Sequence, residues 1–244
     1  MNQSKNSGGF VTGTLIYTQT GLKPIEQIQV GDFVLSKSET GEQAYKRVIN
    51  TFEYDDKEVW FVRYVILTED YTKMRERSFF IATGEHPVRV KGYIDNKGEL
   101  HELNIWEPVC ELAKELYLYG GGAVMELHDG RFANVDTLRV GGLLMRSDIP
   151  DYGVVAQRSF LDTSYGFAII FNEGQPELLT DDDIVINADD QLDWRDFPKG
   201  SVGRLNFGFP PLLRKVYNLE VEDFHTYFVG EHGVLVHDAI QQTS

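Results

Sequence analysis

Short runs of alternating apolar and polar residues, separated by Gly, Asn and Asp, extend over most of the 244-residue chain. Successive side chains of a strand point to opposite faces of a sheet, so this alternation is typical of strands with one buried face. β-branched and aromatic residues concentrate in the runs, and turn-forming residues lie between them. Many short strands at this spacing predict an all-β fold. We expect strands at residues 13–18, 33–36, 45–52, 58–67, 78–82, 88–90, 124–127, 132–135, 142–145, 166–171, 184–186, 216–221, 225–229 and 233–237.

Three segments depart from this pattern. Residues 25–28 predict one helical or 3₁₀ turn, and residues 109–116 predict one short helix. Residues 154–198 are acidic and less regular, so we expect an insertion that packs at the edge of the main domain, either as a small subdomain or as loops. The expected organisation is a flexible segment 1–8, a main domain 9–238 that contains the insertion, and a C-terminal flank 239–244.

The net charge of −15 argues against nucleic acid or an anionic membrane as a partner, because such a chain repels phosphate. The single cysteine, Cys110, excludes an intramolecular disulfide and a cysteine-based zinc site. Residues 1–9 have no apolar core like that of a secretory signal, and no apolar run approaches the ~20 residues that span a bilayer. We therefore expect a soluble segment whose targeting signal lies elsewhere.

Three widely separated sequence blocks contain the residues that could take part in a reaction. The first contains a Gly-Phe pair and a later Val-Gly-Asp turn, the second a Thr-x-x-His pattern, and the third a strand that ends in His-Asp. They are Gly9-Phe10-Val11-Thr12-Gly13-Thr14 continuing through residues 21–32, Thr83-Gly84-Glu85-His86-Pro87, and residues 216–229 followed by Gly233-Val234-Leu235-Val236-His237-Asp238.

Together these blocks resemble those of Hint domains, the self-processing β-fold shared by inteins and hedgehog autoprocessing domains. Their sequences most resemble those of the Hint domains that precede toxin modules in bacterial polymorphic toxins. The resemblance implies an all-β, intein-like disk of long curved antiparallel strands with a short helix and an insertion, and with its two termini close together. It also implies a domain of a secreted or cell-surface-delivered bacterial toxin.

The resemblance assigns the first two blocks to the N-terminal reaction of the family. There, a Cys or Ser before the Phe attacks the preceding carbonyl, although resonance makes an amide a poor electrophile. The Thr-x-x-His histidine contacts the scissile amide and the threonine helps to hold it, which implies these roles for His86 and Thr83. Without the other blocks, His86 could equally be a structural histidine before a proline turn.

The third block resembles the family's C-terminal site. There, a terminal Asn cyclises onto its own carbonyl and cuts the chain after itself, the preceding His polarises that carbonyl, and a second His acts as acid or base. By position these are Asp238, His237 and His225. Histidine suits proton transfer near neutral pH. The alternative for His225 is packing between Phe224 and Tyr227.

The sequence differs from the family at both reactive ends. Gly9 has no nucleophile where the family has Cys or Ser, and the carboxylate of Asp238 is a weak nucleophile where the family has Asn. We expect an impaired, single-turnover self-cleaving domain that is degenerate or altered so that the uncut form persists. Gly9→Cys and Asp238→Asn should restore cleavage. The expected partners are the flanking segments, including a downstream toxin module, with an immunity protein as a further candidate; no cofactor or metal is needed.

Two other functions compete with this one. A non-catalytic Hint scaffold that presents or shields a toxin module stays open because of Gly9 and Asp238. A metal-dependent hydrolase would use His86, His128, Asp129 and the acidic run 181–183, but their spacing matches no metal motif. The autoprocessing hypothesis further predicts that the residues of both ends converge in one cleft; these are Gly9, Thr83, His86, His225, His237 and Asp238.

Overall fold

A computed structural model describes residues 8–69, 71, 73–95, 97–113, 122–140, 159–162, 167–172, 175–180 and 213–238. The chain forms two compact units, one made of Met1–Arg139 with Arg214–Ser244 and the other of Val140–Leu213. The second unit contains the predicted insertion 154–198, most of which lies outside the described residues. So do the predicted strands at 142–145 and 184–186, nearly all of the N-terminal segment and the C-terminal flank.

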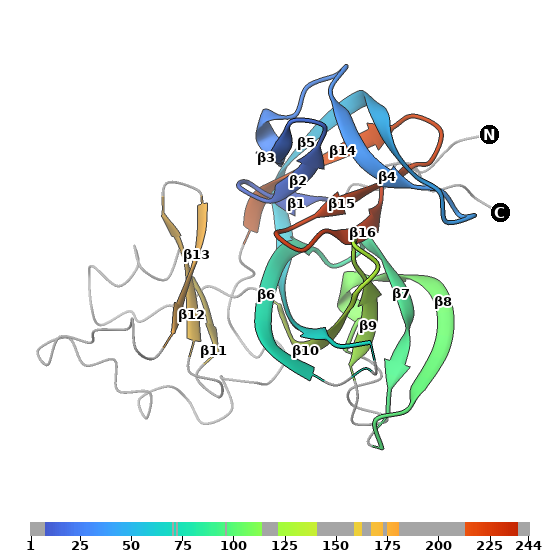
Figure 1. Ribbon diagram of the computed structural model, residues 1–244. Helices are drawn as coiled ribbons and strands as arrows, with labels where there is room; N and C mark the ends of the chain where they lie inside the picture. The colour runs from blue at the N-terminus through green and yellow to red at the C-terminus, as the bar shows by residue number, and fades with distance from the viewer. Residues whose placement is uncertain are drawn as a thin grey trace, which may run out of the picture. The chain divides into compact units, whose positions relative to one another are not determined.

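The fold is all-β with antiparallel pairing, as the alternation predicted (Figure 1). The first unit is one sheet of 13 strands and the second a sheet of three, β11-β12-β13. The strands are β1 (Phe10–Val11), β2 (Leu15–Thr18), β3 (Gly21–Pro24), β4 (Phe33–Lys37), β5 (Gln43–Leu67), β6 (Lys73–Thr83), β7 (Pro87–Ile94), β8 (Leu100–Pro108), β9 (Ala123–Glu126), β10 (Phe132–Val140), β11 (Ser159–Asp162), β12 (Phe167–Asn172), β13 (Gln175–Thr180), β14 (Leu213–Val221), β15 (Thr226–Val229) and β16 (Val234–His237).

Strand β5 is the longest element of the first unit and corrects one sequence prediction. The two strands expected at 45–52 and 58–67 are one continuous strand of 25 residues. The charged run between them does not end the strand, although Asp56 within it has a φ of 53°, in the left-handed region, and the side chains of the run stay largely exposed. Along its length β5 pairs with β4, β14, β6 and β10, so it joins distant parts of the sheet (Figure 1).

The helix predicted at 109–116 was wrong for the part that the structure describes. Residues Val109–Glu111 form a single 3₁₀ turn, η2, and residues 114–116 lie outside the described part. Val and Cys are poor helix formers, and one turn closes too few hydrogen bonds to offset nucleation. The turn at 25–28 was confirmed as the 3₁₀ segment η1, Ile25–Gln27. Within the described residues no helix is long and apolar enough to cross a membrane.

The C-terminal hairpin lies in the middle of the large sheet. Strands β15 and β16 pair with each other, β15 also pairs with β2, and β16 with β7. All four residues of β15 and the first three of β16 are buried, which explains why both read as continuous apolar runs. The first and third sequence blocks, far apart along the chain, therefore meet in one sheet.

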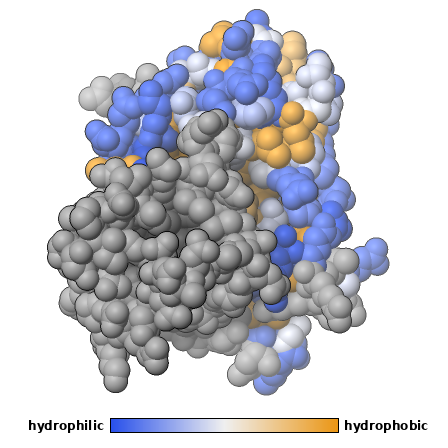
Figure 2. All heavy atoms as spheres, turned by 90° about the vertical axis from the view of Figure 1, so that its left-hand side faces the viewer, coloured by the Kyte–Doolittle hydropathy of each residue, from blue (hydrophilic) through white to orange (hydrophobic). Residues whose placement is uncertain are grey.

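The core is built from the apolar faces of these strands, and the surface is mainly hydrophilic. The largest fully buried side chains include Phe10, Tyr64 and Tyr227, which come from three strands distant in sequence. On the face shown in Figure 2, the coloured surface is mostly blue, with separate small orange patches. On this face hydrophilic residues predominate, while several large aromatic side chains are buried in the core.

Candidate functional site

The N-terminal strand β1 is inserted between β14 and β6. Phe10 pairs with Tyr217 on one side and with Ala82 on the other. The backbone N–H of Gly9 donates to Thr83 Oγ1 at 3.0 Å, and the backbone N–H of Thr83 donates to the Gly9 carbonyl at 2.9 Å. Thr83 therefore holds the amide that the resemblance to Hint domains predicts as the N-terminal reaction site.

The other atom of the same peptide bond has a partner that the sequence did not reveal. Asn218 Nδ2 donates to the carbonyl oxygen of Gly8 at 2.7 Å. The Oδ1 atom of Asn218 accepts hydrogen bonds from the Tyr227 hydroxyl and the Leu219 amide, both at 2.8 Å. Burial raises the pKa of Tyr227 well above its usual value, and the nearby Asp238 adds to the shift, so the phenol keeps its proton. Both polar atoms of the Gly8–Gly9 peptide bond are thus held by buried side chains.

No room exists for a side chain at Gly9. A Cβ atom placed there would lie 2.4 Å from the carbonyl oxygen of Tyr217 and 2.9 Å from its carbonyl carbon. Both atoms belong to the backbone of β14, so they cannot move aside as a flexible side chain can. Glycine at this position offers no side-chain nucleophile, and it allows β1 and β14 to approach more closely than any other residue type permits.

His86 is fully buried, and neither of its ring nitrogens makes a hydrogen bond of standard geometry among the described residues. Its ring packs edge-on against Phe10, with ring centres 4.4 Å apart. Burial lowers the pKa of His86 to about 3; a charge on His237 lowers it further, and the carboxylate of Asp238 and the nearby backbone of His237 oppose both effects. His86 is therefore a neutral imidazole near pH 7, and it lies close to Phe10 of β1 and to His237 and Asp238.

Asp238 is fully buried, and its carboxylate is contacted by two histidines and one amide. Its Oδ2 atom lies 3.0 Å from His225 Nδ1 and accepts a hydrogen bond from the backbone N–H of Val221 at 3.0 Å. Its Oδ1 atom lies 3.5 Å from His237 Nδ1. The same His237 nitrogen lies 3.3 Å from the backbone carbonyl oxygen of Asp238. This carbonyl belongs to the peptide bond between residues 238 and 239.

The turn before β15 positions His225. The backbone of His225 has a φ of 54°, in the left-handed region that side chains other than glycine seldom adopt. Its carbonyl oxygen accepts a hydrogen bond from the backbone N–H of Asp238 at 2.8 Å, and Thr226 pairs with His237 in the hairpin. The strained turn thus places the imidazole against the Asp238 carboxylate. This contact differs from the alternative in which His225 only packs between aromatic rings.

The structure brings together the six residues that the sequence singled out. Gly9 is hydrogen-bonded to Thr83, and the backbone N–H of His86 donates to the Thr83 carbonyl oxygen at 3.3 Å. His86 experiences the charges of His237 and Asp238, and Asp238 contacts His225. Sequence reasoning missed Asn218, Tyr217 and Tyr227, which stood within the third block but had no role assigned to them. The one available signal was that Asn218 is a polar residue at an inward position of an apolar strand.

The histidine and acidic residues proposed for the competing hydrolase have structural partners. His128 Nδ1 lies 2.9 Å from the carbonyl oxygen of His232. Asp129 pairs with Arg131 at 2.7 Å across the turn between β9 and β10. The acidic run 181–183 lies outside the described residues. The part of the chain that the structure describes therefore adds no support to a metal-dependent hydrolase built on these residues.

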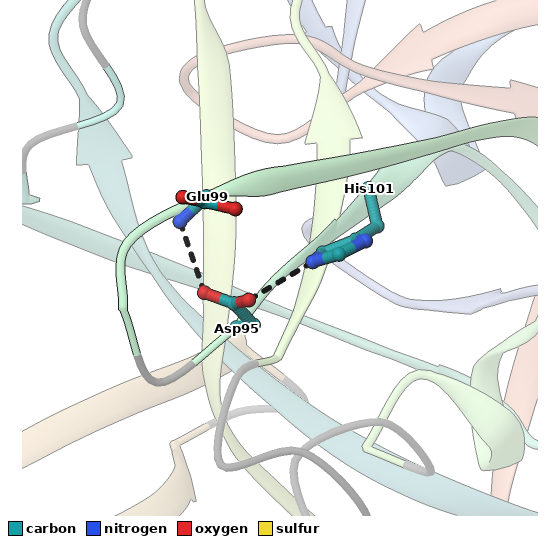
Figure 3. A group of neighbouring side chains, drawn as sticks. All are labelled: Asp95, Glu99 and His101. Atoms are coloured by element: carbon teal, nitrogen blue, oxygen red, sulfur yellow. Dashed lines mark hydrogen bonds and ion pairs between the residues drawn. The ribbon is translucent and has the colours of Figure 1, made fainter.

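One group of possible metal ligands occurs on the hairpin between β7 and β8. Asp95, Glu99 and His101 have ligand atoms within 4.8 Å of one another (Figure 3). Asp95 Oδ1 accepts the backbone N–H groups of Lys97 and Glu99, and Asp95 Oδ2 lies 3.0 Å from His101 Nε2. These hydrogen bonds lower the pKa of Asp95 to about 2, the contact with His101 contributing most. The hydrogen bonds of Asp95 to Lys97, Glu99 and His101 stabilise this exposed hairpin loop.

The chain is similar in structure to several inteins, but it matches no protein-family model and no curated protein. One similar structure is a bacterial intein-like domain from Clostridium thermocellum, with 22% identity, a TM-score of 0.48, and coverage of 94% of this chain and 98% of that one. Another is a DnaB intein from Synechocystis, with 11% identity, a TM-score of 0.48, and coverage of 96% and 100%. A third is the M86 variant of the Ssp DnaB mini-intein, with 11% identity, a TM-score of 0.49, and coverage of 98% and 99%. At these identities and scores the similarities assign no residue a role.

Proposed function

We propose that this chain is an intein-like autoprocessing domain whose site serves to cut the peptide bond after residue 238 and so release a downstream module, in a form that Gly9 and Asp238 impair. The observation that carries the proposal is the position of His237. Its Nδ1 atom lies 3.3 Å from the carbonyl oxygen of that bond, while the side chain of residue 238 is held by His225 and Val221. An electrophile, a polarising group and a side chain next to the carbonyl carbon are thus assembled at one bond.

The chemistry of this site depends on residue 238. With Asn at this position, the side-chain nitrogen attacks the carbonyl carbon of its own residue, a succinimide ring closes, and the bond to the nitrogen of residue 239 breaks. His237 polarises the carbonyl oxygen, and the departing nitrogen takes up a proton. With Asp238 the attacking group is a carboxylate, which is a weaker nucleophile and forms a ring that water reopens. The chain with Asp238 is therefore expected to stay uncut for long periods.

The geometry around Gly9 favours a reaction at the C-terminal end only. Gly9 has no nucleophile, and the backbone of Tyr217 occupies the space that a side chain would need. His86 is neutral and packs against Phe10. The backbone N–H of Gly9 donates a hydrogen bond to Thr83 Oγ1. Transfer of the upstream acyl group has no starting point in this arrangement. The function that the geometry supports best is cleavage at one end, without joining of the flanking segments.

The test compares the chain with its Asp238→Asn variant, each carrying a folded reporter after residue 244. The variant should release the reporter over hours to days, and intact mass should place the cut after residue 238. A mass increase of one water on the N-terminal product, appearing later, would report opening of the succinimide. A folded variant that remains intact, or that is cut at another bond, contradicts the proposal.

The alternative is a non-catalytic scaffold that presents or shields a neighbouring module. The close approach of Gly9 to Tyr217 favours it, since that contact removes one reactive end through the backbone itself. Under this alternative Asp238→Asn stays uncut although the fold is intact. We further propose that the released module is a toxin of a bacterial polymorphic system and that an immunity protein is its partner. The test expresses the native downstream segment in bacteria, once alone and once still joined to this uncut domain. Growth inhibition by the free segment would support the proposal.

A further inference from the structure

We propose that Trp106 is a positioning residue for the reaction at the C-terminal end, because its indole holds the imidazole of His237 beside the carbonyl of residue 238. The two rings pack edge to face, with their centres 5.2 Å apart and their planes at 82°. The inference rests on the proposed function, since it concerns the histidine that polarises this carbonyl.

The register of three neighbouring strands explains how an indole on β8 reaches an imidazole on β16. Val236 of β16 pairs with Val88 of β7, and both side chains are buried in the core. Because side chains alternate along a strand, the residues that follow them, His237 and Arg89, lie on the other face of the sheet. Arg89 pairs with Trp106 of β8, and paired residues share a face. Trp106 and His237 therefore lie on one face with β7 between them, and the large indole spans that distance.

The contacts between His237 and Asp238 are too long to fix the imidazole alone. His237 Nδ1 lies 3.3 Å from the carbonyl oxygen of Asp238 and 3.5 Å from its Oδ1 atom. An N–H···O hydrogen bond usually measures about 2.7–3.2 Å, so both contacts are weak. A histidine without stronger contacts turns between staggered rotamers. The indole against the imidazole restricts this rotation, so that Nδ1 stays beside the carbonyl oxygen.

Two charged side chains hold Trp106 itself in place. Its Nε1 atom donates to Glu39 Oε1 at 2.9 Å. The guanidinium carbon of Arg89 lies 5.2 Å from the centre of the indole, a cation–π contact. Arg89 Nη1 lies 3.5 Å from Glu39 Oε2, so one carboxylate binds both the indole and the cation. A cavity of about 160 Å³ adjoins these three residues, so the polar contacts, and not packing alone, set the position of the indole.

The experiment uses the full chain and makes two separate measurements. The first is the rotamer of His237 in the uncut chain with Asp238, from the three-bond couplings of its Hβ atoms by NMR. The second is the rate of reporter release in the Asp238→Asn background. Trp106→Leu should average the couplings of His237 between rotamers and slow release by roughly 10- to 100-fold, the scale for misplacing a reacting group. Trp106→Phe keeps a ring beside His237, so it should retain one rotamer and recover most of the rate.

Tyr93→Leu is the matched control. Tyr93 stacks on His101 in the same pair of strands, with ring centres 4.8 Å apart, so this variant also removes an aromatic ring from a histidine. It should change neither the rotamer of His237 nor the rate of release. Urea midpoints identify conditions in which every variant is folded, and release is compared there. If Trp106→Leu does not fold, Glu39→Ala replaces it; loss of the indole's acceptor should change both measurements in the same direction by a smaller amount.

Three results overturn the proposal. They are a single His237 rotamer that persists in Trp106→Leu, release that Trp106→Leu does not slow, and release that Tyr93→Leu slows equally. A folded Asp238→Asn variant that stays uncut contradicts the proposed function instead, because that variant keeps Trp106. In that case the rotamer measurement on the chain with Asp238 decides by itself whether Trp106 holds His237.

Discussion

The Nδ1 atom of His237 lies 3.3 Å from the backbone carbonyl oxygen of Asp238, the residue that follows it in the chain. The same atom lies 3.5 Å from the Oδ1 atom of the Asp238 side chain. One imidazole thus faces both the carbonyl that would be attacked and the side chain that would attack it. This relationship makes His237 the first residue to test.

His237→Ala in an Asp238→Asn background should slow release of a downstream reporter by ~100-fold or more, the usual effect of removing a general acid–base group. The reason is loss of the group that polarises the Asp238 carbonyl. Release is measured by gel and by intact mass. His101→Ala is the matched control, since that imidazole pairs with Asp95 on the exposed β7–β8 hairpin. Equal rates for the two variants would remove His237 from the mechanism.

Gly9→Ala should destabilise the protein by ~1–3 kcal/mol, because its Cβ overlaps the backbone of Tyr217. Gly9→Cys carries the same Cβ, so it should be destabilised similarly and should release no upstream segment when thiol is added. This outcome differs from the repair that the sequence alone predicted. The measurements are urea unfolding and intact mass. At Gly98 a Cβ meets no atom within 4 Å but φ is +84°, so Gly98→Ala shows the cost of positive-φ strain without overlap, a strain that Gly9 does not have. Efficient thiol-induced cleavage of Gly9→Cys would show that β1 readily moves.

His86 should make the protein less stable as the pH falls from about 6.5 toward about 3. Its pKa is lowered from 6.5 to about 3 in the folded chain, so the unfolded chain takes up a proton in this window and the folded chain does not. Stability attributable to His86 is therefore complete above pH 6.5 and falls by up to ~1.4 kcal/mol per pH unit below it. Urea unfolding of the wild type and of His86→Leu between pH 7.5 and 4.5 checks this. Equal slopes for both proteins would contradict it.

Asp238→Ala should be less stable than Asp238→Asn. In the alanine variant the buried N–H of Val221 loses its acceptor, which costs ~1–3 kcal/mol, whereas the asparagine oxygen can still accept it. Denaturation midpoints of the two variants without a downstream segment provide the comparison. A midpoint for Asp238→Ala equal to that of Asp238→Asn would mean that the Val221 contact contributes nothing to stability.

The amino-acid sequence by itself determined the all-β class, most strands of the first unit and the turn at residues 25–28. These features depend on neighbouring residues, since the period of the apolar positions and the turn-forming residues decide them. The sequence was less reliable where short-range signals were weak. Two strands were predicted on either side of the charged run that lies within β5, and a helix was predicted for the residues after Pro108. In both cases pairing or packing with distant segments decided the outcome.

The tertiary structure alone decided the state of the two chain ends. Asn218 and Gly8 are 210 positions apart, and no local pattern relates them. The gap between β1 and β14 is set by how Phe10 packs into the core, so only the folded chain shows that Gly9 leaves no room for a side chain. The resemblance of the three sequence blocks to Hint domains marked Thr83, His86 and His237 as residues to examine. Which atoms they contact depends on sub-ångström distances between strands that only the packed sheet defines.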